Sequence, residues 1–325
     1  MPRFSLVSLC RIAALLCFAI ISSMTGAQAI TLPPMIRLIV PFTPGASNDI
    51  FGRALSEQLT NKLGITVVVE NKPGAGGIIG SQEVARAKPD GSTLLFSSNS
   101  FVTRAAIDEK LPFNPRTSFV PVALVAQGAM LLVVSNETNY QTVADLIADS
   151  KRRNINFGSA GIGSIGQLSG ELFVSQAGIE MTHVPYKGIT PGLTDMIGGR
   201  LFSMITTPAS IGTAVKGKQI KALAVTSLQP SPFFPDLPTV AATVPGYSTD
   251  VWWGVYAPAN TPKDLVDYLN QAIREISVTQ KMLALFAKEA AEPSNMTANE
   301  FAVYVNKELD KWQKLAKERG IKNID

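Results

Sequence analysis

The chain has 325 residues and a formal net charge of +4, which is long enough for one large or two ordinary domains with a complete core. So small a net charge gives no reason to expect a nucleic-acid partner, because such proteins need a strongly basic surface. Both cysteines, Cys10 and Cys17, lie near the N-terminus. The rest of the chain can therefore form neither a disulfide nor a cysteine metal site.

Residues 1–29 have the pattern of a secretory signal peptide. Arg3 and Arg11 come before an apolar run at residues 12–21, and the A-x-A pattern of a cleavage site ends at Ala29. The apolar run is too short to favour a membrane span. We therefore expect cleavage after Ala29 and export to the periplasm.

A short apolar strand at residues 36–40 leads through a small-residue loop into a helix. Pro41 and Pro44 stop the strand, and Gly45 permits backbone angles that other residues resist. Such a loop directs free backbone N–H groups at one point, which suits a carboxylate or a phosphate, although an ordinary strand-to-helix turn has the same pattern. The helix opens with three residues that favour N-cap positions, Ser47, Asn48 and Asp49. Asp49 either selects an amino group of a ligand or caps its own helix.

A second loop of the same composition follows a strand at residues 65–70. Residues 71–77, with the sequence NKPGAGG, lead into a helix at 78–87. A third strand at 93–97 ends in the polar loop Ser98-Asn99-Ser100. This succession predicts a parallel sheet with right-handed crossovers, and the ends of its strands would place these loops at one ligand-binding edge.

Two apolar runs at residues 119–126 and 130–134 are separated by Gln127-Gly128, where we expect the chain to cross into a second lobe. A third glycine-rich loop, residues 158–164, opens a helix in that lobe. The strand at 251–257 would return the chain to the first lobe, on which the C-terminal helices up to Arg319 should pack. Two lobes joined by two crossings can close over a small ligand. Further strands are expected at 154–157, 181–184, 201–205 and 220–225, and further helices at 142–151 and 191–197.

Several segments together resemble one family. They read VPFTPGASNDIFGR, VVVENKPGAGGIIG, AKPDGSTLLF, FGSAGIGS and HVPYKG, with VWWGVYAPANTP closer to the C-terminus. On these segments the chain resembles the Bug or TctC family of extracytoplasmic solute receptors, the binding components of tripartite tricarboxylate transporters. The resemblance covers nearly the whole chain after residue 29, in order, so it is more specific than any single glycine loop.

The resemblance implies an α/β fold of the type II periplasmic-binding-protein class, with residues 30–126 and 252–325 in lobe 1 and 127–251 in lobe 2. It also implies a monomer that binds a small organic carboxylate and meets membrane transporter subunits, without catalytic residues, metal or cofactor. Loops 42–49 and 72–77 would hold the carboxylate through backbone N–H groups and water. The residues expected at the site are Phe42, Gly45, Ala46, Ser47, Asn48, Asp49, Ala75, Gly76, Ser100, Ser159, Gly163, Ser164, Tyr186 and Thr207.

Three positions depart from the family pattern. Ala46 stands where a second glycine is usual, and Gln167 where histidine is common. Thr206-Thr207 replaces a frequent acidic residue, which makes the site less suited to an amine. Because family members bind di- and tricarboxylates, amino acids and nicotinate-like compounds, the ligand stays open.

An exported enzyme acting on a small anion is the alternative. Residues 74–80 give a G-x-G-x-x-x-G pattern, but Pro73 stands in the turn, and the next acid downstream of the helix, Asp90, lies in a Pro-Asp-Gly turn, so a dinucleotide site is disfavoured. The single histidine, His183, lies in a strand, and no serine sits in a G-x-S-x-G pattern, which disfavours a hydrolase. The scattered acidic residues predict no metal site.

Two features of the C-terminal third are read as structural. Trp252 and Trp253 alternate along a strand, so we expect one in the core and one at the surface. The charged residues of the last helix should form a solvated face; they are Glu308, Lys311, Lys314, Lys317 and Glu318.

Overall fold

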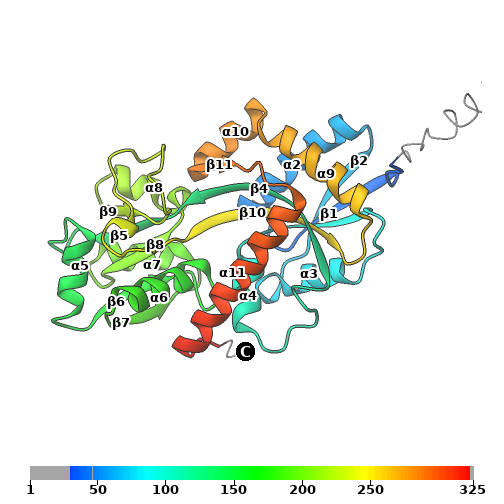
Figure 1. Ribbon diagram of the computed structural model, residues 1–325. Coiled ribbons are helices and arrows are strands. Elements are labelled where there is room, and N and C mark those ends of the chain that lie inside the picture. The colour runs from blue at the N-terminus through cyan, green and yellow to red at the C-terminus, as the bar shows by residue number, and fades with distance from the viewer. Residues whose placement is uncertain (1–29, 46, 323–325) are drawn as a thin grey trace, which may run out of the picture. The chain divides into compact units, whose positions relative to one another are not determined.

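The computed structural model describes residues 30–45 and 47–322, and the elements below all belong to the unit Leu32–Asp325. The expected signal peptide, residues 1–29, lies outside the described residues, and so does Ala46 of the first loop. The unit contains two β-sheets with helices packed around them (Figure 1).

The first sheet has six strands in the order β11-β4-β10-β3-β1-β2. The expected parallel arrangement is confirmed for β1, which pairs in parallel with both β2 and β3. The strands that join later in the chain pair differently: β10 runs antiparallel to β3 and β4, and β11 antiparallel to β4. The strands are β1 (Met35–Val40), β2 (Thr66–Asn71), β3 (Thr93–Ser98), β4 (Phe119–Ala129), β10 (Asp250–Pro258) and β11 (Ala291–Pro293).

The second sheet has five strands in the order β7-β6-β8-β5-β9. Its middle strand β8 pairs in parallel with β6 and antiparallel with β5. Every strand of this sheet comes from the chain between β4 and β10. The strands are β5 (Leu131–Ser135), β6 (Ile155–Ser159), β7 (Met181–Pro185), β8 (Ser203–Thr206) and β9 (Ile220–Val225).

The chain passes between the sheets at Met130 and returns at Thr249. Thr226 ties the two passages together. Its hydroxyl accepts a hydrogen bond from the Met130 N–H at 2.8 Å, and its carbonyl accepts one from the Thr249 N–H at 3.0 Å. Thr226 has no solvent exposure, so both passages share one buried anchor.

Gln127 and Gly128, where the chain was expected to cross, are part of β4, which continues to Ala129. Gly128 pairs with Val251 and also lies against the entry to β11. A Cβ at this position would stand only 2.5 Å from the Ala290 carbonyl oxygen. The glycine therefore allows two backbones to approach closely rather than ending the strand.

The helices fall near the expected ranges, with one addition. The addition is α4 (Ser100–Ile107), where the sequence indicated a loop. Helix α11 packs on β4 and α4, as expected, and it also contacts α6 of the second lobe (Figure 1). The other helices are α2 (Ser47–Leu63), α3 (Ile78–Ala85), α5 (Val143–Ser150), α6 (Ile165–Ala177), α7 (Ile189–Ile197), α8 (Pro208–Lys216), α9 (Lys263–Ser277), α10 (Gln280–Phe286) and α11 (Ala298–Arg319), with single 3₁₀ turns η1 (Ala75–Gly77), η2 (Val240–Ala242) and η3 (Ala287–Glu289).

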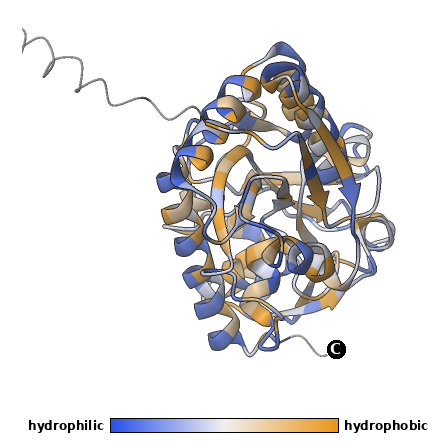
Figure 2. Ribbon diagram, turned by 90° about the vertical axis from the view of Figure 1, so that its right-hand side faces the viewer, coloured by the Kyte–Doolittle hydropathy of each residue, from blue (hydrophilic) through white to orange (hydrophobic). Residues whose placement is uncertain are grey.

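The two tryptophans of β10 are both buried, so the expected surface position for one of them is wrong. Trp252 packs edge-on against Phe301 of α11, with ring centroids 5.9 Å apart. Trp253 packs against Phe51 of α2 at 4.7 Å. Because β10 is an interior strand with helices on both faces, both side-chain directions lead into the core. Figure 2 shows the hydrophobic character of the strands inside the fold.

The prediction that Glu308 lies on a solvated face of α11 is also wrong, because its side chain is buried. Its carboxylate accepts hydrogen bonds from Trp312 Nε1 at 2.9 Å and from Lys311 Nζ at 3.1 Å. Lys311 also donates to the Ser248 carbonyl at 2.9 Å, next to the return passage. Burial raises the pKa of the nearby Asp250 to about 6, although the positive charge of Lys311 opposes this.

Candidate functional site

Asp49 holds the first loop in place. Its carboxylate accepts hydrogen bonds from the Gly45 N–H and from Asn71 Nδ2, both at 2.9 Å, and it forms an ion pair with Arg53. Burial alone would raise the pKa of Asp49, but the hydrogen bonds from Arg53, Gly45 and Asn71 lower it below its ordinary value. The buried carboxylate thus joins the first loop to the end of β2.

At the start of α2, the side chain of Ser47 meets a buried acid, Glu289. The Ser47 hydroxyl donates a hydrogen bond to Glu289 Oε1 of η3. Glu289 Oε2 and Asn48 Oδ1 are both buried and have no partner within the described part of the chain. Burial raises the pKa of Glu289, and the Ser47 hydrogen bond offsets part of this. Because η3 packs against α8, this end of the first loop faces the second lobe.

The second loop turns through four consecutive residues with positive φ: Gly74 (134°), Ala75 (48°), Gly76 (64°) and Gly77 (99°). It leads into α3, whose first turn has no side-chain cap. The Ile78 N–H donates to the Ala75 carbonyl, and the N–H groups that follow it at the start of a helix have no partner within the helix, which suits an anion.

The first and second loops lie side by side. A Cβ on Gly77 would stand 3.6 Å from Pro41 and 3.7 Å from the Phe42 ring. The Phe42 carbonyl accepts a hydrogen bond from Asn71 Nδ2 at 3.0 Å. The two neighbouring parallel strands thus bring their loops together at one sheet edge, in agreement with the topology rule.

Ser100 begins α4, so the loop expected at Ser98-Asn99-Ser100 is wrong. The Ser98 and Ser100 hydroxyls are hydrogen-bonded at 2.8 Å, and Asn99 donates to the Asp250 carbonyl at 2.9 Å. The strand therefore passes directly into a helix whose first residues are fixed to β10.

Helix α4 lies between the second loop and the third. A Cβ on Gly76 would stand 3.3 Å from Arg104 Cδ, and one on Gly163 would stand 2.6 Å from Ile107 Cδ1. Loops from both lobes thus meet α4 at adjacent turns. Arg104 was not among the residues expected at the site, because it belongs to α4, and the polar residues 98–100 had indicated a loop there. Asn99, as a potential N-cap before the apolar residues of 101–107, was the available signal.

The third loop satisfies most of its own polar groups. The Ser164 hydroxyl caps α6 by accepting the Gln167 N–H at 3.3 Å, and it donates to the Gly161 carbonyl at 2.7 Å. Gln167 Oε1 accepts the Gly163 N–H at 2.8 Å. This helix start is therefore less open to an anion than that of α3.

Ser159 is fully buried at the end of β6 and lies 2.7 Å from His183 Nε2. Burial lowers the pKa of His183 to about 4, so the imidazole is neutral near pH 7. A substrate cannot reach the buried hydroxyl in this conformation. The pair therefore positions the third loop, and the geometry does not favour the hydrolase interpretation.

Tyr186 and Thr207 complete the set of expected residues in the second lobe. The Tyr186 hydroxyl donates to Asp195 Oδ2 at 2.9 Å, and burial together with that carboxylate raises its pKa to about 12. Its backbone N–H donates to the Ser159 carbonyl at 3.0 Å. Thr207 is hydrogen-bonded to Ser210 and stands at the start of α8, which has no side-chain cap.

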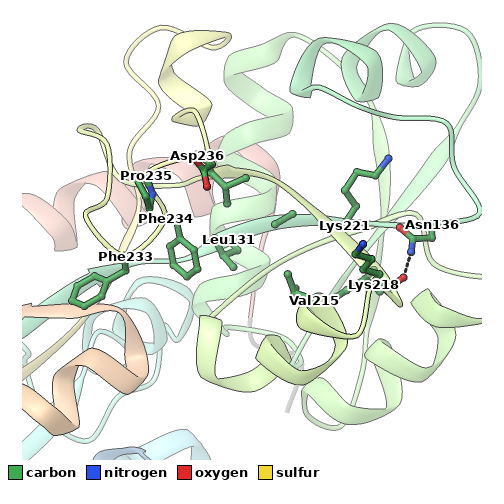
Figure 3. A pocket seen from close by; sticks show the side chains of 12 residues that line it. Leu131, Asn136, Val215, Lys218, Lys221, Phe233, Phe234, Pro235 and Asp236 are labelled. Carbon is green, nitrogen blue, oxygen red and sulfur yellow. Dashed lines mark hydrogen bonds between the residues drawn. The ribbon is translucent and has the colours of Figure 1, made fainter.

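A cavity of about 610 Å³ lies apart from these loops, beside the edge strand β9 (Figure 3). Phe234 and Leu131 line its apolar part, and Lys218 and Lys221 lie at another side. Lys221 already donates to the Tyr140 carbonyl at 2.9 Å. Within the described ranges, no group of three or more His, Cys, Asp or Glu side chains is arranged to hold a metal ion. None of the helices described there combines the length and apolar character of a membrane span.

Comparisons with known proteins agree with the resemblance found in the sequence. The profile of the tripartite tricarboxylate transporter family receptor, TctC, matches residues 51–321. The protein BugT of Bordetella pertussis is 32% identical over 88% of this chain and 90% of its own. The solved structure of R. palustris Rpa4515 with adipate is 33% identical, with a TM-score of 0.77, over 90% of this chain and 99% of that one. MatC from Rhodopseudomonas palustris with bound malate is 26% identical, with a TM-score of 0.73, over 87% and 99%.

These matches confirm the expected two-lobed fold of the type II periplasmic-binding-protein class, with one sheet in each lobe and two passages between them. The matched region includes the second and third loops and all of α4. The chain therefore belongs to the tripartite tricarboxylate transporter receptor family, a family of periplasmic solute-binding receptors.

Proposed function

We propose that this protein captures a small organic carboxylate in the periplasm and presents it to a membrane transporter of the tripartite tricarboxylate type. The observation that carries the proposal is the meeting of the second and third loops, one from each lobe, on either side of α4. Relatives of the same fold are described with adipate and with malate. The open helix start of α3 beside this meeting point suits an anion.

The ligand would first bind lobe 1, where the paired first and second loops present backbone N–H groups. Closure of lobe 2 about the passages at Met130 and Thr249 would then bring the third loop and the start of α8 onto it. The hinge is short and its two strands share the Thr226 anchor, which favours rotation as a rigid body. The closed form would provide the surface that a transporter recognises.

Within this proposal the fourteen residues expected from the sequence divide by role. Those that offer groups to the ligand are in the first, second and third loops, at the start of α4 and at the start of α8. Asp49, Ser159, Ser164 and Tyr186 shape these loops from within, because each holds its own loop through hydrogen bonds. Asp49 accepts from Gly45 and Asn71, the Ser159 and Ser164 hydroxyls donate to the Gly161 carbonyl, and the Tyr186 N–H donates to the Ser159 carbonyl. The ligand-facing set is Phe42, Gly45, Ala46, Ser47, Asn48, Ala75, Gly76, Ser100, Gly163 and Thr207.

Residues 1–29 are proposed to direct export and to be removed after Ala29, which leaves a monomeric receptor whose lobe 1 is 30–126 and 252–325 and whose lobe 2 is 127–251. Expression of the full chain should yield a periplasmic product whose intact mass is that of a chain starting at Ile30. Retention of the full mass in the cytoplasm would contradict this part of the proposal, and sedimentation of the product would test the monomer.

The ligand class can be tested by thermal-shift and calorimetric titration of the periplasmic product. The panel comprises aliphatic mono-, di- and tricarboxylates, amino acids and pyridine carboxylates. We expect a saturable shift with at least one carboxylate and no chemical change in the ligand. If no carboxylate binds, or if a bound compound is turned over, the receptor function is wrong.

A further inference from the structure

Arg104 occupies the junction of the two lobes. Its Cδ, Nε and Cζ atoms lie 3.3, 3.5 and 3.7 Å from the point where a Cβ of Gly76 would stand. Its Cδ also lies 3.8 Å from the equivalent point at Gly163. Both glycines have positive φ, and at Gly76 a larger side chain would also press on the arginine. The absence of side chains on the two loops thus leaves room for Arg104 between them.

The guanidinium group is not fully paired in this position. The Arg104 side chain is only 16% exposed, and the nearest carboxylate contact is Asp108 at 3.6 Å, longer than a hydrogen bond. Its Nε is buried without a hydrogen-bond partner within the described part of the chain. A buried donor without a partner is costly, and guanidinium carries five N–H donors suited to planar anions.

We propose that Arg104 binds the second carboxylate of a dicarboxylate ligand. This inference rests on the proposed function and assigns to one residue a contact that backbone amides alone do not provide. The first carboxylate would take the N–H groups at the start of α3, and the second would lie against the guanidinium group where the third loop closes over it.

The charges near the first and second loops agree with a doubly negative ligand. Asp49 is already bound to Arg53, Asn71 and Gly45, so its charge is compensated. Burial and raised pKa favour the neutral form of Glu289. The start of α3 and the Arg104 guanidinium group, which faces the Asp108 carboxylate at 3.6 Å, add positive potential on this side of the lobe contact.

The test compares Arg104→Gln with the unmodified protein by calorimetric titration. The probes are the dicarboxylates succinate, glutarate and adipate, and the monocarboxylate of matching length for each. In the unmodified protein the best dicarboxylate should bind more tightly than its monocarboxylate. Arg104→Gln should weaken binding of the dicarboxylate about 10- to 100-fold, as loss of a hydrogen bond to a charged group does. It should leave the affinity for the monocarboxylate unchanged. Arg104→Lys should give an intermediate loss, because it keeps the charge without the planar fork.

Arg116→Gln is the matched control, since Arg116 binds Asn306 and Asp310 of α11 rather than either loop. It should change neither affinity. Equal weakening of mono- and dicarboxylates by Arg104→Gln would overturn the proposal, because the residue would then only support the second loop. Unchanged dicarboxylate affinity would overturn it too. Failure of the unmodified protein to bind any carboxylate would instead refute the proposed function.

Discussion

Asp250 offers a quantitative test of the electrostatics at the return passage. Its pKa rises from 3.8 to about 6 because burial disfavours the charged form more than Lys311 favours it. A shift of about two units corresponds to roughly 3 kcal/mol, and the remaining exposure of the side chain reduces this to about 1–3 kcal/mol. The folded protein thus holds a carboxylate that is more stable when protonated.

The direction in which stability changes with pH follows from this shift. Well below pH 3.8 the carboxyl group is protonated in both the folded and unfolded states, and at pH 4 it is only partly ionised in the unfolded state, so replacing it by an amide has little effect there. As the pH rises through 6, the folded protein must hold a buried charge and loses stability. Asp250→Asn should therefore match the unmodified protein at pH 4 and exceed it by about 1–3 kcal/mol at pH 8.

Urea unfolding followed by tryptophan fluorescence measures both conditions, because Trp252 and Trp253 are buried beside this position. The exposed Asp236 gives a control, and Asp236→Asn should change the free energy of unfolding by less than about 0.5 kcal/mol, as surface substitutions usually do. If Asp250→Asn lowers the free energy of unfolding at pH 8, the carboxylate forms a stabilising ion pair with Lys311, and the argument from burial is wrong.

Three further changes test the loops. Gly163→Ala should weaken carboxylate binding about tenfold, because φ is +78° and the new methyl group would meet Ile107; Ile107→Ala in the same chain should recover part of the affinity, and no recovery would argue against that contact. His183 has a pKa lowered to about 4, so it contributes stability that is present above pH 6.5 and is lost as the pH falls toward 4. Between pH 7 and 4.5, the His183→Asn variant should therefore lose less free energy of unfolding than the unmodified protein. An equal loss would contradict the role of burial. Asp49→Ala should lower the free energy of unfolding by about 2–4 kcal/mol, since it leaves the Asn71 amide and the Gly45 N–H without their partner; a loss below about 0.5 kcal/mol in urea unfolding would show that the first loop does not depend on this carboxylate.

The sequence predicted the elements whose signal is local. Strands β1 to β3 and the helices after the glycine loops follow from apolar runs, turn residues and N-caps. Helix α4 was missed because Ser98, Asn99 and Ser100 are polar and small, as in a loop. Only the contacts of Asn99 with β10 show that the strand passes directly into a helix.

Errors about burial have a common physical cause. Alternation along β10 correctly places Trp252 and Trp253 on opposite faces, but it does not reveal that helices cover both. Likewise the charge of Glu308 suggested solvent, although Lys311 and Trp312 compensate it inside the fold. Arg104 could not be recognised at all from spacing, because its significance depends on Gly76 and Gly163, which lie far from it in the sequence and on either side of it in the structure.

The placement of the second sheet has a consequence for engineering. All its strands come from one uninterrupted stretch, and the entry and exit of that stretch are fastened to the same threonine. A segment with adjoining ends can be exchanged as a cassette with little disturbance to its host. Chimaeras could join the first lobe of one receptor to the second lobe of another, with the junctions at Met130 and Thr249. Their affinities would show how much each lobe contributes to the ligand preference.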